Sequence, residues 1–280
     1  MSDLRPASRT GGALAARTLP YRAVLGSRIR AQRSYRTSFR LDLLSSFLVG
    51  VVELAEIWVL FRSVHSLGGL DLGQVLLVFG LADLAFSLAD LAFGHCDELA
   101  TFLRAGTLDV FYLRPQPLLL QLVTSDVSLR RLSRAGVGVA ALVVGLVVND
   151  VAPTPRSVGL LALALVSGVA TSSALFVLAA GLQFFVVDGA EMTNAFVYGG
   201  RYASTQPAGV WSRPIKLVFG FLFPVAFIGY LPVVTLLGLP GIEWMPSWLG
   251  WCAPVAAVWA WTAALLTWRW GVRHYQGGGG

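Results

Sequence analysis

Six long apolar stretches, separated by short or charged segments, dominate the pattern of hydrophobic and polar positions along the chain. They lie near residues 41–61, 72–93, 133–151, 157–187, 215–238 and 248–270. A bilayer core of about 30 Å is crossed by roughly twenty helical residues. Most of the stretches meet that length directly, but the third is shorter and Gly-rich, and the fourth is long enough to tilt or to project. The pattern therefore predicts an all-α integral membrane protein with six transmembrane helices and both termini on one side.

The distribution of basic residues agrees with this topology. With the six spans placed as above, all of the 21 Lys and Arg residues except Arg62 and Arg156 fall on one face of the membrane. Because cytoplasmic segments of membrane proteins are enriched in Lys and Arg, we predict that this face is cytoplasmic. The composition, 56% hydrophobic and only 13% charged, excludes an ordinary soluble domain.

Charge also divides the chain into three regions. Residues 1–40 are basic, with nine Arg residues from Arg5 to Arg40, and are predicted to be cytoplasmic. Within them, residues 14–40 place apolar side chains broadly on one helical face beside a stripe of Arg. This indicates either an amphipathic helix lying on anionic lipid headgroups or a disordered basic tail. Residues 41–272 form the predicted six-span domain, and residues 273–280 a flexible cytoplasmic tail that ends in a Gly run.

The common catalytic motifs are absent from the sequence. The single lysine, Lys216, follows Arg213 and Pro214 rather than a Gly-rich loop, so the chain has no Walker A phosphate-binding motif. Neither an H-E-x-x-H pair nor a G-x-S-x-G elbow occurs. His95 and Cys96 are adjacent but have no second pair of ligands, so no metal site is predicted. We expect a protein that is not itself an enzyme and holds no cofactor of its own.

Four acidic residues lie inside the first two predicted spans. Glu53 and Glu56 are three residues apart and Asp83 and Asp90 are seven apart, so each pair shares a helix face. An acid near mid-membrane costs on the order of 2.5 to 3.5 kcal/mol on insertion scales. In this assignment no Arg or Lys lies at comparable depth to pair with them. The acids either line a polar route for a substrate or cation, or are partly protonated and hydrogen-bonded between helices.

The connection between the second and third spans contains an apolar segment outside the bilayer. Residues 97–115 predict a short helix that is broken by Gly106, restarted by a Thr107-x-Asp109 cap and ended before Pro115. Apolar residues in it, among them Leu108 and Phe111, are uncomfortable in water. They indicate burial against the membrane or another protein.

Two short motifs carry a family resemblance. The run Gly106-Thr107-Leu108-Asp109, followed by Leu113-Arg114-Pro115, resembles the signature of a bacterial family of ABC transporter permeases of the type 2 exporter class, ABC-2. The stretch 223–232, with its two prolines and its aromatic residues, is similar to the fifth span of that family. The size, the topology and the basic N-terminus match over nearly the whole chain.

The resemblance implies a permease subunit of an ATP-driven exporter in the bacterial plasma membrane. It implies pairing with a second six-span permease, identical or homologous, and with two separate ATP-binding subunits that hold ATP and Mg. It also implies a cytoplasmic coupling helix that docks on the ATPase, with the contact made by Thr107, Leu108, Asp109, Phe111 and Arg114. The surface helix ahead of the first span resembles the connecting helix of this class. Lipids are further expected partners, and nucleic acid is not.

Three questions stay open at the level of sequence. Pro224 and Pro232 predict either a gate in the fifth span or an ordinary packing kink. An alternative function is a cation-coupled secondary transporter that uses Glu53, Glu56, Asp83 and Asp90 as an ion relay. The transported substrate is not indicated by any motif.

Overall fold

The computed structural model describes residues 36–125, 131–186, 191, 193–242 and 244–275. These residues are mainly helical, and the part of the chain that they cover contains isolated bridges but no β-strand. The prediction of an all-α membrane protein is confirmed. The predicted surface helix over residues 14–40 falls almost wholly outside the described residues, and so do the last residues of the predicted tail.

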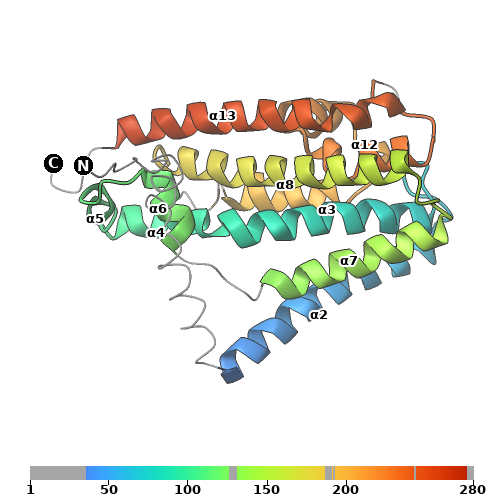
Figure 1. Cartoon of the computed structure of the whole chain (residues 1–280), viewed down its shortest axis with the longest axis horizontal. Helices are drawn as coiled ribbons and strands as arrows, with labels where there is room; N and C mark the ends of the chain where they lie inside the picture. The colour runs from blue at the N-terminus through green and yellow to red at the C-terminus, as the bar shows by residue number, and fades with distance from the viewer. Residues whose placement is uncertain (1–35, 126–130, 187–190, 192, 243, 276–280) are drawn as a thin grey trace, which may run out of the picture.

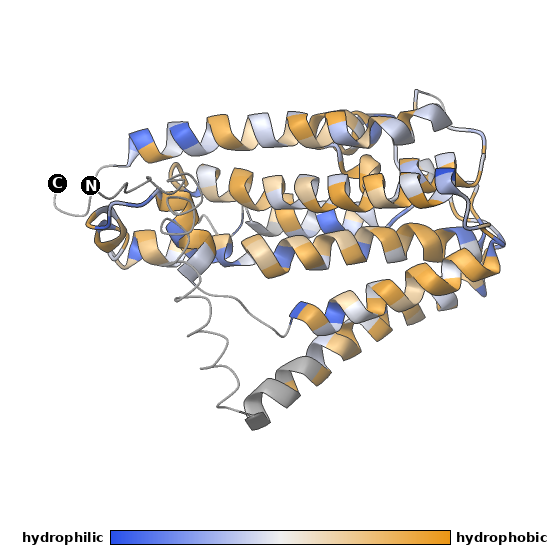
Figure 2. Cartoon of the chain, in the orientation of Figure 1, coloured by the Kyte–Doolittle hydropathy of each residue, from blue (hydrophilic) through white to orange (hydrophobic). Residues whose placement is uncertain are grey.

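Long helices form the body of the molecule and run along its long axis (Figure 1). They are α2 (Arg36–Phe61), α3 (Leu72–Phe93), α7 (Arg131–Val148), α8 (Pro155–Gln183) and α13 (Ala253–His274). Within the described residues these five are long and apolar enough to cross a membrane. Hydrophobic residues cover their middle lengths, and hydrophilic residues gather toward the two ends of the bundle (Figure 2).

The two ends of the bundle differ. One end, the platform end, carries η1 (Gly94–Glu98), α4 (Leu99–Arg104), α5 (Asp109–Tyr112) and α6 (Leu118–Ser125), beside the last turn of α13 (Figure 1). The other end, the loop end, carries the connections 62–71, 149–154 and 237–252. Capping boxes start two helices there, Asp71 with Gln74 for α3 and Thr154 with Ser157 for α8, which satisfies orphan backbone N–H groups.

A short irregular segment, residues 194–210, makes a further crossing beside α3. It contains η2 (Asn194–Tyr198), α10 (Gly199–Ser204) and η3 (Ala208–Val210). Tyr198 bonds Asp97 at the platform end, Arg201 bonds Asp83 in mid-helix, and Gly209 packs on the backbone of Gly68 at the loop end. Because its partners run backward along α3, the segment lies antiparallel to that helix over its whole length. The predicted spans 157–187 and 215–238 leave residues 188–214 as a connection on the face that we predict to be cytoplasmic, and this prediction is wrong for residues 194–210.

The segment predicted as the fifth span is a bent pair of helices. The two limbs, Arg213–Leu222 and Val225–Leu236, are bent by 69° at Phe223 and Pro224. The first limb starts at the loop end, where the Arg213 guanidinium lies 5.8 Å from the ring centre of Trp244. The second limb, which includes α12 (Tyr230–Leu236), ends there too, since Leu237 lines a cavity with Thr154. Both ends of the pair thus lie on one side, as in a re-entrant loop.

This topology changes which basic residues lie at each end of the bundle. The count of six crossings remains, but residues 194–210 replace 215–238 as the fifth. Arg213 and Lys216 move to the loop end and Arg201 moves into the bundle. The described basic residues toward the platform end are Arg36, Arg40, Arg104, Arg114, Arg131, Arg134, Arg269 and Arg273.

Close backbone contacts place α3 in the centre of the bundle. Side chains added to Gly80 of α3, or to Gly138 and Gly145 of α7, would overlap backbone atoms of the facing helix. Small residues let two membrane helices approach in this way, and the seven-residue spacing keeps Gly138 and Gly145 on one face. The glycines that make the predicted span 133–151 Gly-rich therefore form the interface between α7 and α3.

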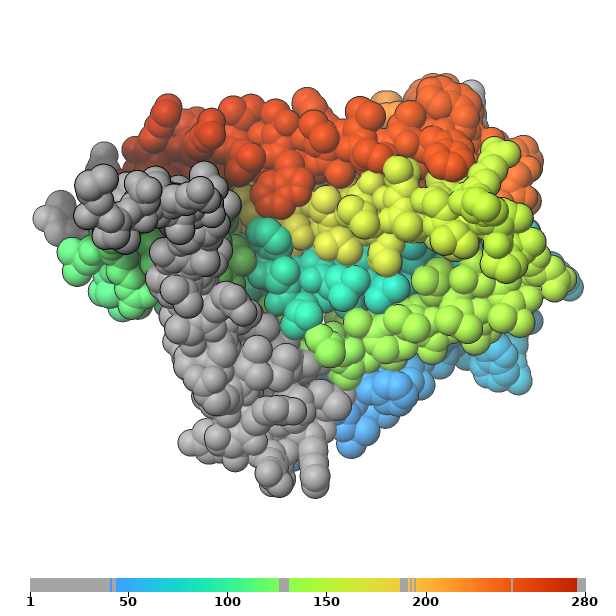
Figure 3. All heavy atoms as spheres, in the orientation of Figure 1, coloured from blue at the N-terminus to red at the C-terminus, as the bar shows by residue number. Residues whose placement is uncertain are grey.

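The outer helices leave apolar surface uncovered. In the space-filling view α13 forms the upper edge of the visible face, α8, α3 and α7 follow below it, and part of α2 shows beneath α7 (Figure 3). The exposed large side chains on the outer helices are almost all apolar, for example Val52 on α2, Val147 on α7 and Val258 on α13. Such a surface suits lipid or another apolar subunit rather than water.

Candidate functional site

A cluster of four charged residues ties four elements together inside the bundle. Arg201 of α10 donates through Nη2 to Asp83 Oδ1 at 2.7 Å and through Nη1 to Glu53 Oε1 at 3.0 Å. Arg134 of α7 donates through Nη2 to the same Glu53 oxygen at 2.8 Å. Its Nε lies 3.6 Å from Asp83 Oδ1. Each acid therefore contacts both guanidinium groups.

The cluster is almost closed to solvent. The side chain of Asp83 has no exposed area and that of Arg201 is 9% exposed, whereas Glu53 is 23% exposed. Two carboxylates and two guanidinium groups carry no net charge when ionised. The desolvation cost of each ion is offset only because it keeps its partners. This arrangement favours holding helices together over attracting a free cation.

A second ion pair lies closer to the platform end. Arg131 Nε is 3.2 Å from Asp90 Oδ2, and Arg131 Nη1 donates to the backbone carbonyl of Asp90 at 2.7 Å. Glu56, by contrast, is exposed outside the cluster, and the Tyr202 hydroxyl lies 3.4 Å from its Oε1. The structure therefore brings Glu53 and Asp83 together, and leaves Asp90 and Glu56 apart from them.

The expectation that no basic residue lies at the depth of the acids is wrong. Arg201 was assigned to a cytoplasmic connection, and Arg134 to the edge of a span, where its long side chain still reaches Asp83. One signal was available in the sequence: Arg131 and Arg134 are three residues apart at the start of an apolar stretch, so both lie on one helical face. No comparable signal marked Arg201. Hydrogen bonding between helices could also involve buried Ser hydroxyls, but Ser87 Oγ and Ser172 Oγ have no hydrogen-bond partner among the described residues.

The platform is the second candidate site. Gly106 adopts φ +65°, a left-handed conformation that separates α4 from α5 as predicted. The predicted Thr-x-Asp cap does not form, since α5 begins at Asp109 without a side-chain cap. The Thr107 hydroxyl donates instead to the carbonyl of Phe102 at 3.5 Å. Leu108 is completely buried, so it supports the platform from beneath and does not reach its surface.

Apolar side chains cover the outer face of α5. Leu113 is 84% exposed, Val110 is 52% exposed and Tyr112 is 48% exposed. Arg104 and Arg114, also exposed, are cations close to them in the sequence. Exposed aliphatic and aromatic side chains with Arg close by are typical of protein interfaces.

The residues beneath α5 hold it in place. Gln121 Nε2 donates to the carbonyls of Phe111 at 3.1 Å and Gln116 at 2.7 Å. The rings of Phe102 and Phe111 meet edge to face at 5.2 Å. Phe111 is half-buried in this contact, while Asp109 is exposed and accepts a hydrogen bond from Tyr275.

The comparison with known families bears on both sites. A family model described as ABC-2 family transporter protein matches residues 47–279. The chain belongs to the ABC-2 transporter family. No curated protein and no solved structure matches the chain. The match covers all six crossings and the platform, so this ABC-2 permease is a multi-pass membrane component of an ABC transporter.

The two prolines of the permease occupy different positions in the bent pair. Pro224 lies at the break between the limbs, just before η5 (Val225–Phe227). Pro232 is buried in the first turn of α12, where its missing N–H costs no helical hydrogen bond. The bend therefore belongs to Pro224. The limbs meet deep in the bundle, where the rings of Phe223 and Phe196 are 4.9 Å apart.

Proposed function

We propose that this ABC-2 permease is the membrane subunit of an ATP-driven exporter and forms half of its translocation pathway. The observation that carries the proposal is the platform, whose exposed apolar face at one end of a membrane-embedded bundle offers a docking surface for a separate ATPase. Since the sequence lacks a Walker A motif, ATP and Mg would be bound by that partner.

The chemistry of the platform supports an ATPase as its occupant. Leu113, Val110 and Tyr112 would bury their apolar area in the partner, and aromatic and apolar anchors of this kind supply most of the binding energy in protein interfaces. Arg104 and Arg114 would pair with acidic residues at the rim. Thr107, Asp109 and Phe111 position these contacts, and Leu108 packs below them.

The same proposal orients the protein in the membrane. The platform end would face the cytoplasm of a bacterial cell, with both termini on that side. The eight described Arg residues toward this end, against Arg62, Arg156, Arg213 and Lys216 at the loop end, support this orientation. The re-entrant pair with Pro224 would then line the outer mouth of the pathway as a gate.

A second permease, identical or homologous, would complete the pathway. The exposed apolar faces of α2 and α13 offer surface for it and for lipid. Two ATP-binding subunits would then drive one pair of permeases. Binding of ATP would bring the ATPases together and push both platforms, and hydrolysis would reset the inward-facing state.

The alternative of a cation-coupled secondary transporter has less support. Its relay would use Glu53, Glu56, Asp83 and Asp90, but three of these acids are already paired with Arg. A relay needs acids that exchange a cation or a proton along a polar route. Glu53, the most exposed member of the cluster, is the acid that we propose for contact with a substrate.

Co-purification tests the docking surface. Val110→Asp and Leu113→Asp place charges on the platform, and Val210→Asp is the matched control because Val210 is 47% exposed at the loop end. We expect the platform variants to lose the ATPase at least tenfold, about 1.4 kcal/mol, and the control to keep it. Equal recovery of the ATPase with all three variants, each eluting as intact membrane protein, would contradict the proposal.

A further inference from the structure

Tyr275, the residue after the last helix, contacts the platform directly. Its hydroxyl donates to Asp109 Oδ1 at 3.0 Å. Its ring stacks on that of Tyr112, with the ring centres 5.9 Å apart and an angle of 3° between the ring planes. Asp109 and Tyr112 are the first and last residues of α5. One side chain thus contacts both ends of the short helix.

The other face of Tyr275 contacts the end of α8. Its ring meets that of Phe184 edge to face at 6.0 Å, and Phe184 meets Trp268 of α13 at 5.6 Å. The backbones of α8 and α13 approach closely here, because a side chain on Gly181 or Gly271 would overlap the facing helix. Tyr275 therefore joins α5 to a tightly packed pair of spans.

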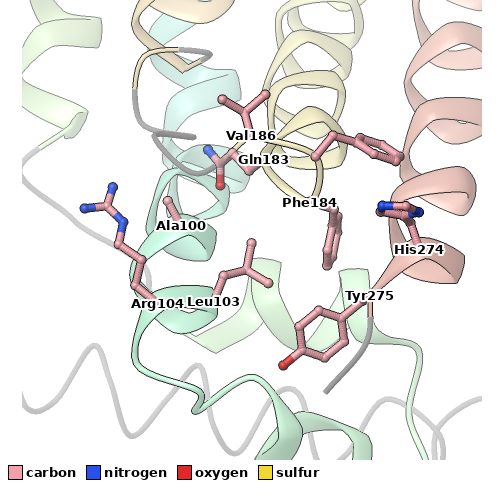
Figure 4. Close-up of a pocket in the computed structure, with 9 residues that line it drawn as sticks. Ala100, Leu103, Arg104, Gln183, Phe184, Val186, His274 and Tyr275 are labelled. Atoms are coloured by element: carbon pink, nitrogen blue, oxygen red, sulfur yellow. The ribbon is translucent and has the colours of Figure 1, made fainter. Parts of the chain in front are cut away.

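Little else fixes α5 from this side. A cavity of about 420 Å³ lies between α4 and the ends of α8 and α13. Figure 4 shows Leu103 and Arg104 on its α4 side and Phe184, His274 and Tyr275 on its opposite side. Because the cavity separates these elements, packing between α4 and α13 is incomplete, and the Tyr275 contacts bridge the gap.

A helix of four residues does not hold its own position. α5 has one turn, no side-chain cap and no buried residue of its own. On the α6 side it is held by Gln121 and on the α4 side by Phe102. On the side of the last two long helices it is held by Tyr275.

We infer that Tyr275 is a positioning residue of the docking helix, through which displacement of α5 by the ATPase reaches α8 and α13. This inference rests on the proposed function. Without it, a push on α5 would reach α3 and α8 through α4, α6 and η1, and would reach the end of α13 only indirectly, through α8. With the Tyr275 contacts in place, α13 and α3 receive the push together, so the permease moves as one body.

The hydroxyl of Tyr275 is suited to a permanent contact. Burial, with further contributions from the hydrogen bond and charge of Asp109, raises the pKa of Tyr275 to about 12. The phenol therefore stays protonated and remains a donor to the carboxylate across the physiological range.

Substitutions separate the two contacts. Tyr275→Phe removes the hydrogen bond and keeps the ring, and Tyr275→Leu removes both. Asp109→Asn keeps an acceptor oxygen, whereas Asp109→Ala does not. Tyr202→Phe is the matched control, because it also removes a phenolic hydroxyl that lies near a carboxylate, that of Glu56 at 3.4 Å, but on α10 and away from the platform.

Two spin labels report the movement in the assembled complex with its ATPase, reconstituted in lipid. Gln116→Cys follows α5 and Arg273→Cys lies in the last turn of α13. Cys252→Ala removes the accessible native thiol, and Cys96, 1% exposed, stays unlabelled. We expect one narrow distance distribution that is unchanged when ATP and vanadate trap the ATPases, because both labels move together.

In Tyr275→Leu we expect the distance distribution between the two labels to broaden and its mean to shift by several ångströms when the ATPases are trapped. ATP turnover should fall at least threefold. Tyr275→Phe should give a smaller change that Asp109→Ala does not increase further, and Asp109→Asn should change the distance less than Asp109→Ala does. A purely structural role would lower the melting temperature without making the distance depend on nucleotide. A wild-type distance and turnover in Tyr275→Leu overturns the inference alone, whereas failure of the wild-type chain to retain an ATPase overturns the proposed function as well.

Discussion

The guanidinium of Arg201 bonds Asp83 at 2.7 Å in the centre of the bundle. This contact joins the irregular fifth crossing to the central helix, at the level where Glu53 and Arg134 bring in two further spans. This crossing contains a π-helical turn and a buried Arg, and its fully buried apolar side chains include Val197 and Ala208. Its place beside α3 depends on this cluster.

Loss of one partner from the cluster should destabilise the permease strongly. Arg201→Gln leaves Asp83 buried with one guanidinium instead of two, and breaking a buried ion pair costs about 3 to 5 kcal/mol. We expect a melting temperature well below that of the wild type in detergent. The double variant Arg201→Gln with Asp83→Asn should lose less than the sum of the single changes, because it leaves no unpaired charge.

The exposed Arg269 provides the control for that series. Arg269→Gln should change the free energy of unfolding by no more than about 0.5 kcal/mol, as surface substitutions do, so its melting temperature should stay close to that of the wild type. An Arg201→Gln protein as stable as Arg269→Gln would show that the cluster does not hold the fifth crossing.

Cysteine labelling should reveal the re-entrant pair. Lys216→Cys, at the start of the first limb, and Ser66→Cys, in the 62–71 connection, should react with an impermeant maleimide from the same side of the membrane. Leu113→Cys should react from the opposite side. If Lys216→Cys and Leu113→Cys share a side, the pair is a single broken span and residues 194–210 do not cross.

Two glycines of α7 should respond in opposite ways to the same substitution. Gly138→Ala would press a methyl group into the backbone of Leu84, and such overpacking costs about 1 to 3 kcal/mol. Gly136 has open space around it, so Gly136→Ala should be neutral or add up to about 1 kcal/mol through helix propensity. Thermal unfolding of the two purified variants makes the comparison, and equal destabilisation would contradict the close α3–α7 contact.

Asp97, which lies beyond the end of α3, should make stability depend on pH. Burial raises the pKa of its carboxyl to about 6, although the hydrogen bond from Tyr198 opposes this. The folded state then binds more protons than the unfolded state, whose carboxyl titrates near 3.9. The contribution of Asp97 is present below about pH 4 and is lost as the pH rises toward 6.

The measurement is the melting temperature between pH 4 and pH 7 for the wild type and Asp97→Asn. We expect the wild-type curve to fall relative to that of the variant over this range. Parallel curves would mean that Asp97 titrates like an exposed carboxyl.

Hydrophobic pattern alone revealed most of the bundle. The helices around residues 41–61, 72–93 and 157–187 are nearly where they were expected, because a bilayer-length apolar run can satisfy its backbone only as a helix. The break at Gly106 followed likewise from one residue's freedom at positive φ. The local sequence sufficed for both predictions, because each feature depends only on residues of its own segment.

The same rules failed where one segment depends on another. The run 215–238 has the length of a span, yet it turns back at Pro224, and the less apolar 194–210 crosses instead. Length and hydropathy cannot distinguish a crossing from a re-entrant pair, because both bury the same apolar area. A short mixed segment crosses only when its polar groups find partners, here Asp97 for Tyr198 and Asp83 for Arg201.

Hydropathy and short motifs in the sequence were enough to predict an all-α membrane protein, its apolar helices and its resemblance to the ABC-2 family. Only the tertiary structure decided which residues pair inside the bundle and that Tyr275 meets Asp109, 166 positions away. The physical reason is the distance along the chain between the groups that interact. Hydropathy acts on each residue through the surrounding solvent, whereas an ion pair or a hydrogen bond needs two groups that chain folding alone brings together.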